Sequence, residues 1–96
     1  MKQTKKTLKN KWFQDIGQIT FLEAHINYTM IHFEDGSKKI HAYPLKRYEN
    51  LLGQNLAFSR IHRKYIVNKD FIQTSSNYSV KLSCGRVLPV ARRRKV

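Results

Sequence analysis

Apolar side chains recur at every second position in the first half of this chain, and that period restricts it to antiparallel strands. Three runs carry the pattern before the first proline: residues 18–24, 27–33 and 38–43. The first alternates around Ile19 and Phe21, and a two-residue period is that of a strand with one buried face. The first two runs are joined by a short link, and Asp35-Gly36 is a strong signal for a tight turn before the third. We therefore expect a β-meander.

The period changes only once, at the first proline of the chain. Leu45, Tyr48 and Leu52 have helical spacing, with proline where a first helical turn tolerates it and Gly53 where a helix ends. The pattern predicts one short helix at about residues 44–52. Strand patterns then return at residues 58–68, 71–75, 78–83 and 86–90, with turns at Ser76-Asn77 and Cys84-Gly85. The expected class is mostly β, with antiparallel sheets and one short helix.

Residues 58–68 read FSRIHRKYIVN, and this segment carries most of the functional information. Its basic and histidine side chains stand between apolar anchors, in a run too β-branched and aromatic to favour a helix. We expect a strand that holds cationic side chains at a surface while its other residues are buried. The residues that we expect in the core are Leu45, Tyr48, Ile61, Tyr65 and Val80.

The positive charge is concentrated at the two ends of the sequence. The whole chain has a formal net charge of +13, of which residues 1–11 supply five lysines without an acid. Residues 12–59 amount to −1 and residues 60–96 to +9, where Asp70 is the one acid. A globular middle of ordinary charge between two cationic ends is typical of a nucleic-acid-binding protein. A solvated charge run or an affinity for anionic membrane would give the same composition, but we favour nucleic acid.

Length, cysteine content and hydropathy exclude several other classes. The 96 residues suffice for one domain with a modest core. Cys84 is the single cysteine, so no intramolecular disulfide can form and a reducing cytoplasm is the simpler location. No apolar run approaches the ~20 residues of a membrane span, and the basic N-terminus lacks the apolar core of a signal peptide. We expect a cytoplasmic protein without a membrane partner.

No group of residues predicts catalysis or a metal site. The four histidines and the cysteine lack the close pair spacings of a zinc site. Glu23 and Asp70 could be imagined as acid and base, but no motif for acyl, phosphoryl or hydride transfer accompanies them. His62 lies alone in an apolar stretch, where a histidine is more often a hydrogen-bonded structural residue than a ligand or catalyst. We expect no enzyme activity, no cofactor and no metal.

Several strings of residues occur in an informative order. They are ITFLEA (19–24) with Tyr28 four residues on, Pro44-Leu45-Lys46 followed by Glu49-Asn50-Leu51-Leu52, FSRIHRKYIVN (58–68) with Ile72 after it, and LPVARR (88–93). Together they resemble the LytTR family, the DNA-binding output domain of many bacterial response regulators, over essentially all of residues 12–94. Two positions differ from the usual pattern: Ala91 replaces a small polar residue, and Lys64 replaces a serine.

The resemblance implies antiparallel β-sheets stacked as an elongated sandwich, with the short helix at one side. It also implies that loops, not a recognition helix, enter successive major grooves on one face of the duplex. The family's base-contacting positions correspond to Asn27 or Tyr28, to Arg63 and to Arg93. Arginine can present a bidentate fork to guanine, asparagine can pair with adenine, and Tyr28 could donate to a phosphate or pack against a thymine methyl.

The remaining cations of these segments suit phosphate contacts, which supply affinity with little sequence information. The candidates are Lys64, Lys69, Arg92 and Arg94. Each position also has an ordinary structural interpretation. Arg63 could be a solvated strand residue, residues 92–95 only a cationic tail, and Asn27 a residue selected for its turn geometry.

The sequence thus predicts sequence-specific binding of double-stranded DNA by a bacterial transcription regulator, either an output domain of a two-component system or a stand-alone protein. The expected partners are paired or repeated DNA half-sites, a second copy of the chain on DNA, and an upstream receiver or sensor. Residues 1–11 are expected to form a basic arm or edge strand, and residues 12–96 the DNA-binding domain.

Two other functions stay open at this point. One is non-specific binding of RNA or single-stranded DNA, in which aromatic side chains such as Tyr28, Tyr65 or Phe71 stack on bases. The other is a small basic nuclease, suggested only by His62 among cationic residues.

Overall fold

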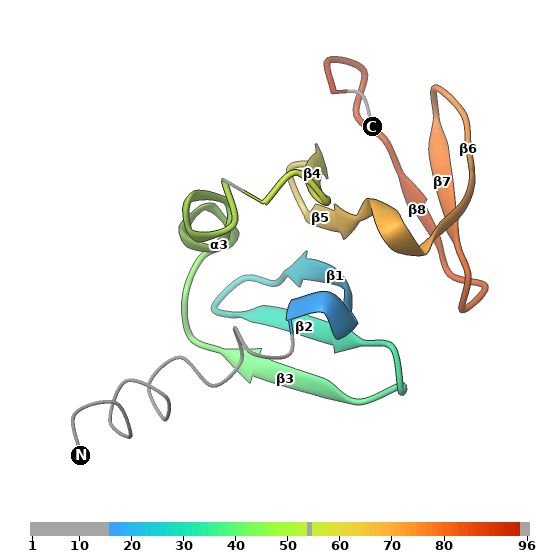
Figure 1. The fold of residues 1–96 in the computed structure, drawn as a ribbon. Coiled ribbons are helices and arrows are strands. Elements are labelled where there is room, and N and C mark those ends of the chain that lie inside the picture. Colours follow the sequence, from blue (N-terminus) through green and yellow to red (C-terminus); the bar gives the residue numbers. More distant parts are fainter. Residues whose placement is uncertain (1–15, 54, 95–96) are drawn as a thin grey trace.

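The computed structural model describes residues 16–53 and 55–94, which form two antiparallel sheets and one α-helix (Figure 1). The larger sheet contains β1 (Ile19–Ala24), β2 (Thr29–Phe33), β3 (Lys38–His41), β4 (Phe58–His62) and β5 (Tyr65–Asn68), in the order β3-β2-β1-β5-β4. The smaller sheet contains β6 (Ile72–Ser75), β7 (Ser79–Leu82) and β8 (Val87–Pro89), in that order. The expected class, mostly β with stacked antiparallel sheets, is confirmed. The arm predicted at residues 1–11 lies outside the described residues.

The short helix is α3 (Leu45–Leu51), and two 3-10 turns, η1 (Ile16–Gln18) and η2 (Lys69–Phe71), lead into β1 and β6. Pro44 is the N-cap of α3 and has an extended backbone, so the helix begins one residue after the predicted position. Leu45, Tyr48 and Leu52 are buried, so the helical spacing of these three residues was interpreted correctly. The helix therefore presents its apolar face to the sheet.

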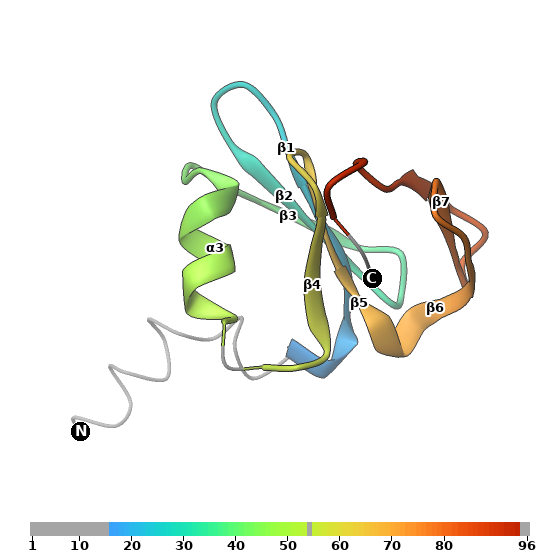
Figure 2. The same ribbon diagram turned by 90° about the horizontal axis from the view of Figure 1, so that it is seen from above.

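The five-stranded sheet is the middle layer of the domain, with α3 against one face and the three-stranded sheet on the other side (Figure 2). Each side has its own core. The core beneath α3 contains Ile19, Leu22, Ile31, Phe33, Leu45, Tyr48, Leu52 and Ile66. The core facing the smaller sheet contains Phe21, Ile61, Val67, Val80, Leu82 and Leu88. This arrangement buries both faces of the central strands.

The central strand β1 departs from the simple alternation expected for it. Ile19 and Phe21 were expected on one face, but they lie in different cores. The register of β1 against β2 shifts between these two residues, and an irregularity of this kind reverses the face that the following side chains occupy. Leu22 consequently shares the α3 core with Ile19. The alternation of β2, by contrast, is confirmed, because Thr29, Ile31 and Phe33 are buried and the residues between them are half-buried.

The segment 58–68 is a hairpin rather than the single strand expected from its composition. β4 and β5 pair antiparallel from Phe58 opposite Asn68 to His62 opposite Tyr65, with a register shift between Arg60 and His62. Arg63 and Lys64 form the turn. The prediction was wrong because this turn contains none of the residues that usually mark one, such as glycine, proline or asparagine. The two cations therefore lie at a tip, where both are exposed.

Two expectations about individual tyrosines need correction. Leu45, Tyr48, Ile61 and Val80 are buried as predicted, but Tyr65 is only half-buried at the margin of the second core. Tyr78 was expected to begin the strand at residues 78–83, yet it is 81% exposed. It precedes the first residue of β7 and belongs to the turn at Ser76-Asn77, so its side chain does not follow the in–out alternation of the strand.

Replacing Ile61 by alanine should lower the free energy of unfolding by about 2–4 kcal/mol, because a fully buried side chain leaves a cavity in the second core. Urea denaturation measures this change. Ile40→Ala is the matched control, since Ile40 is exposed on the edge strand β3 and should cost far less. Equal losses for the two variants would contradict the assignment of Ile61 to the core.

Candidate nucleic-acid interface

Three separate segments of the chain meet on one side of the domain. They are the β1–β2 turn (residues 25–28), the β4–β5 turn (residues 63–64) and the segment after β8 (residues 90–94), and Figure 2 shows all three on the same side. The backbone N–H of Ala24 donates to the carbonyl of Lys64 at 2.8 Å, which joins the first two. The N–H of Ala91 donates to the carbonyl of Ile61 at 2.8 Å, which joins the third. Strand pairing therefore sets their relative positions.

The β1–β2 turn is closed by a backbone hydrogen bond from His25 N–H to the carbonyl of Tyr28, at 2.8 Å. The rings of these two residues stack with their centroids 4.7 Å apart, which stiffens the base of the turn. Ile26 and Asn27 are left exposed at the tip, while Tyr28 is half-buried. Asn27 is thus free to reach outward, whereas His25 covers one face of the Tyr28 ring.

Arg60 holds the β4–β5 turn from beneath. Its Nε donates to the carbonyl of His62 at 2.8 Å, and its Nη2 donates to the carbonyl of Arg63 at 2.6 Å. The third contact joins Nη1 to Oε1 of Glu49 on α3, at 2.7 Å. The guanidinium, whose side chain is only 14% exposed, therefore ties the backbone that carries Arg63 to the helix.

The role of Arg60 was not predicted from the sequence. The sequence of a cationic run does not show whether a given arginine faces solvent or donates hydrogen bonds to nearby backbone carbonyl groups. The signal that could have revealed it is its spacing from Arg63, since a hairpin would bring a side chain three residues earlier under the turn. His62 assists at the same turn, because its Nδ1 accepts a hydrogen bond from the N–H of Lys64 at 3.1 Å.

The segment after β8 folds into a short turn of its own. The N–H of Val90 donates to the carbonyl of Tyr78, and the N–H of Arg94 donates to the carbonyl of Ala91 at 3.0 Å. Arg92 and Arg93 are exposed, and Arg94 is half-buried. Ala91 is thus tied to Ile61 of β4 and Arg94 to Ala91, so Arg92 and Arg93 lie in a turn that backbone hydrogen bonds hold at both ends.

Two shallow depressions join these segments, and Arg63 lines both. One has a volume of about 350 Å³ and lies between the β1–β2 turn, with Asn27 and Tyr28, and the start of α3. The other, of about 480 Å³, is lined by residues 91–94 with His62. Arg63 stands between the other two segments that were predicted to contact bases.

One predicted phosphate candidate lies apart from the rest. Lys69 begins η2, at the open end of the β4–β5 hairpin, where its N–H donates to the carbonyl of Ala57 at 2.7 Å. The tip with Lys64 is at the other end of a four-residue strand, which corresponds to roughly 13 Å of extended chain. Lys64, Arg92 and Arg94 belong to the converging segments, and Lys69 does not.

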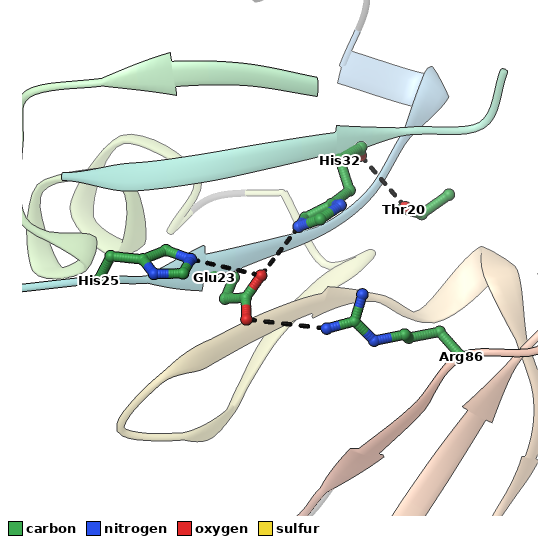
Figure 3. A network of polar contacts seen from close by, with 5 residues as sticks. All are labelled: Thr20, Glu23, His25, His32 and Arg86. Carbon is green, nitrogen blue, oxygen red and sulfur yellow. Dashed lines mark hydrogen bonds and ion pairs between the residues drawn. The ribbon is translucent and has the colours of Figure 1, made fainter. Parts of the chain in front are cut away.

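Glu23 is the centre of a polar network beside the β1–β2 turn (Figure 3). Its Oε1 lies 3.0 Å from Nε2 of His32 and 3.6 Å from Nε2 of His25, and its Oε2 lies 3.7 Å from a guanidinium nitrogen of Arg86. Arg86 comes from the β7–β8 turn, and its guanidinium carbon is also 5.2 Å from the centroid of the Phe21 ring. The network therefore links the two sheets and also contacts His25, the first residue of the β1–β2 turn.

The network also balances the charge of Glu23. Burial alone raises the pKa of this carboxyl, but the hydrogen bond from His32 and the positive charges around it have the larger combined effect, so the pKa is lowered. Glu23 is accordingly ionised at neutral pH. Its carboxylate accepts the hydrogen bond from His32 and lies 3.7 Å from the charged guanidinium of Arg86.

Three histidines have a pKa below the ordinary value of 6.5. Burial is the main cause for His32, His41 and His62 alike. For His62, the nearby charges of Arg63 and Lys64 lower the pKa further. A neutral imidazole is what the hydrogen bond at the hairpin turn requires, because Nδ1 of His62 must be unprotonated to accept from Lys64. The expectation of a structural role for His62 is in keeping with this contact.

Within residues 16–53 and 55–94, no three side chains of histidine, cysteine, aspartate or glutamate are placed to hold a metal ion together. Cys84 is exposed in the β7–β8 turn, beside Gly85 with its positive φ of 94°. None of the helices in the described part of the chain has the length and hydropathy needed to cross a bilayer.

Comparisons with known proteins point in one direction. The family model described as the LytTr DNA-binding domain matches residues 9–96. Among solved structures, the LytTr DNA-binding domain of a protein described as a methyl-accepting/DNA response regulator from Bacillus cereus is similar, with 26% sequence identity and a TM-score of 0.71. That match covers 81% of this chain and 74% of the other. A comparison with curated protein sequences gave no match.

The lowered histidine pKa values predict that the domain loses stability in mild acid. In the unfolded chain these histidines bind protons near pH 6.5, whereas in the folded chain they bind them only at lower pH. As the pH falls through this window the unfolded state takes up more protons, so the free energy of unfolding decreases. The melting temperature should fall between about pH 7.5 and about pH 5.5, and His32→Gln should reduce that fall. A melting temperature that rises toward acid would contradict this account.

The Arg60 contacts predict unequal effects for the two partners of its ion pair. Arg60→Ala removes the donor to two carbonyl groups at the turn and should lower the free energy of unfolding by about 1–3 kcal/mol. Glu49→Gln should cost only about 0.2–1 kcal/mol, because the Glu49 side chain is 42% exposed and keeps a polar partner for Arg60. Urea denaturation of both variants checks the order. A larger loss for Glu49→Gln would show that the ion pair, and not the bonds to the turn, gives Arg60 its role.

Proposed function

This chain belongs to the LytTr DNA-binding domain family, and on that premise we propose that it binds double-stranded DNA sequence-specifically, through turns inserted in the major groove, and so regulates transcription in bacteria. The observation that carries this proposal is the convergence of three cation-bearing segments on one side of the domain, with Arg63 between the other two. The net charge of +13 gives such a surface a strong attraction to a polyanion.

Insertion of turns is favoured because the described residues provide no suitable recognition helix. α3 has seven residues, and its apolar side chains are committed to the core beneath it. A helix that reads the major groove needs a free face along its length. The β1–β2 and β4–β5 turns, in contrast, project from strands whose pairing holds them firmly, as a site for accurate readout requires.

We assign the reading of bases to Arg63, Arg93 and Asn27, with Tyr28 in a supporting role. The two arginines are exposed, and each can offer two donors to O6 and N7 of a guanine. Asn27 is exposed at the tip of its turn and suits adenine in the same groove. Tyr28 stacks on His25 and is half-buried, so it fits contact with a phosphate or a base edge better than insertion.

We assign phosphate contacts to Lys64, Arg92 and Arg94, which surround the proposed base-reading residues. Lys69 would reach only a phosphate further along the duplex, because it lies at the opposite end of the hairpin from Lys64. The Glu49 contact and the two carbonyl contacts occupy Arg60, which therefore positions the turn instead of binding DNA.

Single-stranded nucleic acid is a weaker candidate. Stacking on bases needs exposed aromatic faces. Tyr28 is stacked on His25, and Tyr65 and Phe71 are half-buried. Tyr78 is 81% exposed, but it offers a single face, whereas a strand of successive bases needs several. No catalytic role forms part of the proposal.

We infer that the domain acts in the bacterial cytoplasm, because the chromosome lies there. Paired or repeated half-sites and a second copy of the chain would raise its affinity for a target. The similar Bacillus cereus domain is described as part of a response regulator. An upstream receiver or sensor is the corresponding partner proposed for this chain.

Selection of bound sequences from a random duplex library tests the function directly. An enriched motif, competed by duplex and not by single-stranded DNA, is the expected result. Enrichment without a motif, or preferential capture of single strands, would overturn sequence-specific duplex binding. The spacing of any repeated motif also tests the proposed half-sites.

The roles assigned to individual cations predict two kinds of variant. Arg63→Ala and Arg93→Ala should each cost about 1–3 kcal/mol on the selected site, much less on random duplex, and should relax preference at one position. Lys64→Ala should weaken binding to both duplexes alike and reduce the slope of log K against log salt by about one unit, from roughly −5. Binding titrations over a range of salt concentrations measure both quantities. Equal losses on the two duplexes for the arginine variants would reduce them to phosphate anchors.

A further inference from the structure

Ile26 occupies a position that neither turn chemistry nor packing explains. It lies with Asn27 at the tip of the β1–β2 turn, and its side chain is 98% exposed. Tight turns favour glycine, proline, asparagine, aspartate or serine at such positions, each for a conformational reason. An isoleucine offers none of these advantages, and its β-branched side chain gains nothing from burial here. A role outside folding would account for it.

The turn holds Ile26 outward on a firm base. The hydrogen bond from His25 to Tyr28 closes the turn, and the stacked rings of the same two residues support it. Nε2 of His25 lies near Glu23, so the network that joins the two sheets also reaches the base of the turn (Figure 3). The side chain at the tip is therefore presented at a nearly fixed place relative to Arg63, with which it lines the same depression.

We propose that Ile26 is a specificity-determining residue that reads the C5-methyl group of a thymine in the major groove. This inference rests on the proposed duplex-binding function. Guanine, adenine and cytosine present hydrogen-bonding groups along their major-groove edges, and an isoleucine placed against them would leave those groups without water or a partner. The thymine methyl is the apolar group available there, so an isoleucine held in the groove favours thymine over the other bases.

The neighbouring residue strengthens the choice of partner. Asn27 suits adenine in the same groove, and the major-groove edge of an A·T pair presents in order N7 and N6 of adenine, O4 of thymine and the thymine methyl. Two adjacent residues at one turn tip can therefore read one A·T pair, or two neighbouring pairs, by complementary means. Asn27 supplies hydrogen bonds and Ile26 supplies an apolar contact.

Replacement of single thymines by uracil in the selected duplex tests the proposal, because it removes one methyl group and leaves the base pairing intact. The unchanged protein should lose about four-fold in affinity at one thymine, the value expected for one buried methyl group. Ile26→Ser should bind the thymine and uracil forms of that site equally. Its melting temperature should match the parent's, since the side chain makes no buried contact.

Leu56→Ser is the matched control, because Leu56 is 84% exposed and precedes β4 at the end away from its turn. This variant should keep the full difference between thymine and uracil. If no thymine is sensitive in a duplex that binds normally, the Ile26 proposal is overturned while duplex binding stands. Persistence of the difference in Ile26→Ser would likewise assign the methyl contact to another residue and overturn it. Failure to select any duplex motif would overturn both proposals together.

Discussion

The antiparallel pairing of β1 with β5 is the interaction on which the rest of this domain depends. It places Glu23 opposite Tyr65 and brings Ala24 within hydrogen-bonding distance of Lys64. Two turns that are about 40 residues apart in the sequence thereby become neighbours. The same pairing puts β1 in the middle of the sheet, where both its faces are buried under different cores. Stability and the proposed interface therefore share one structural origin.

Polar contacts then fix what strand pairing brings together. Arg60 binds the carbonyl groups of the β4–β5 turn, and Glu23 connects the base of the β1–β2 turn to Arg86 of the smaller sheet. Both are charged groups held largely out of water, which is costly unless their hydrogen bonds are satisfied. Arg60 and Glu23 are therefore engaged in contacts within the domain, whereas Arg63, Arg93 and Lys64 are exposed. A surface that binds DNA needs this separation of roles between cations.

The sequence predicted the elements well where local patterns decide them. The spacing of Leu45, Tyr48 and Leu52 predicted α3, and the alternation from Thr29 to Phe33 predicted β2, because each pattern follows from a regular period. The hairpin at Arg63-Lys64 was missed because its turn contains no residue typical of turns. The roles of Arg60 and Glu23 could not be predicted either, since their partners come from distant elements that only the pairing of strands brings close.

The central claim is that residues 25–28, 63–64 and 90–94 form one surface on duplex DNA. Backbone amide chemical shifts measured by NMR, with and without the selected duplex, test it most directly. The largest changes are expected in these three segments together, with small changes at Lys69 and at the β7–β8 turn. Changes confined to one segment, or centred on α3 or on the exposed Tyr78, would contradict it.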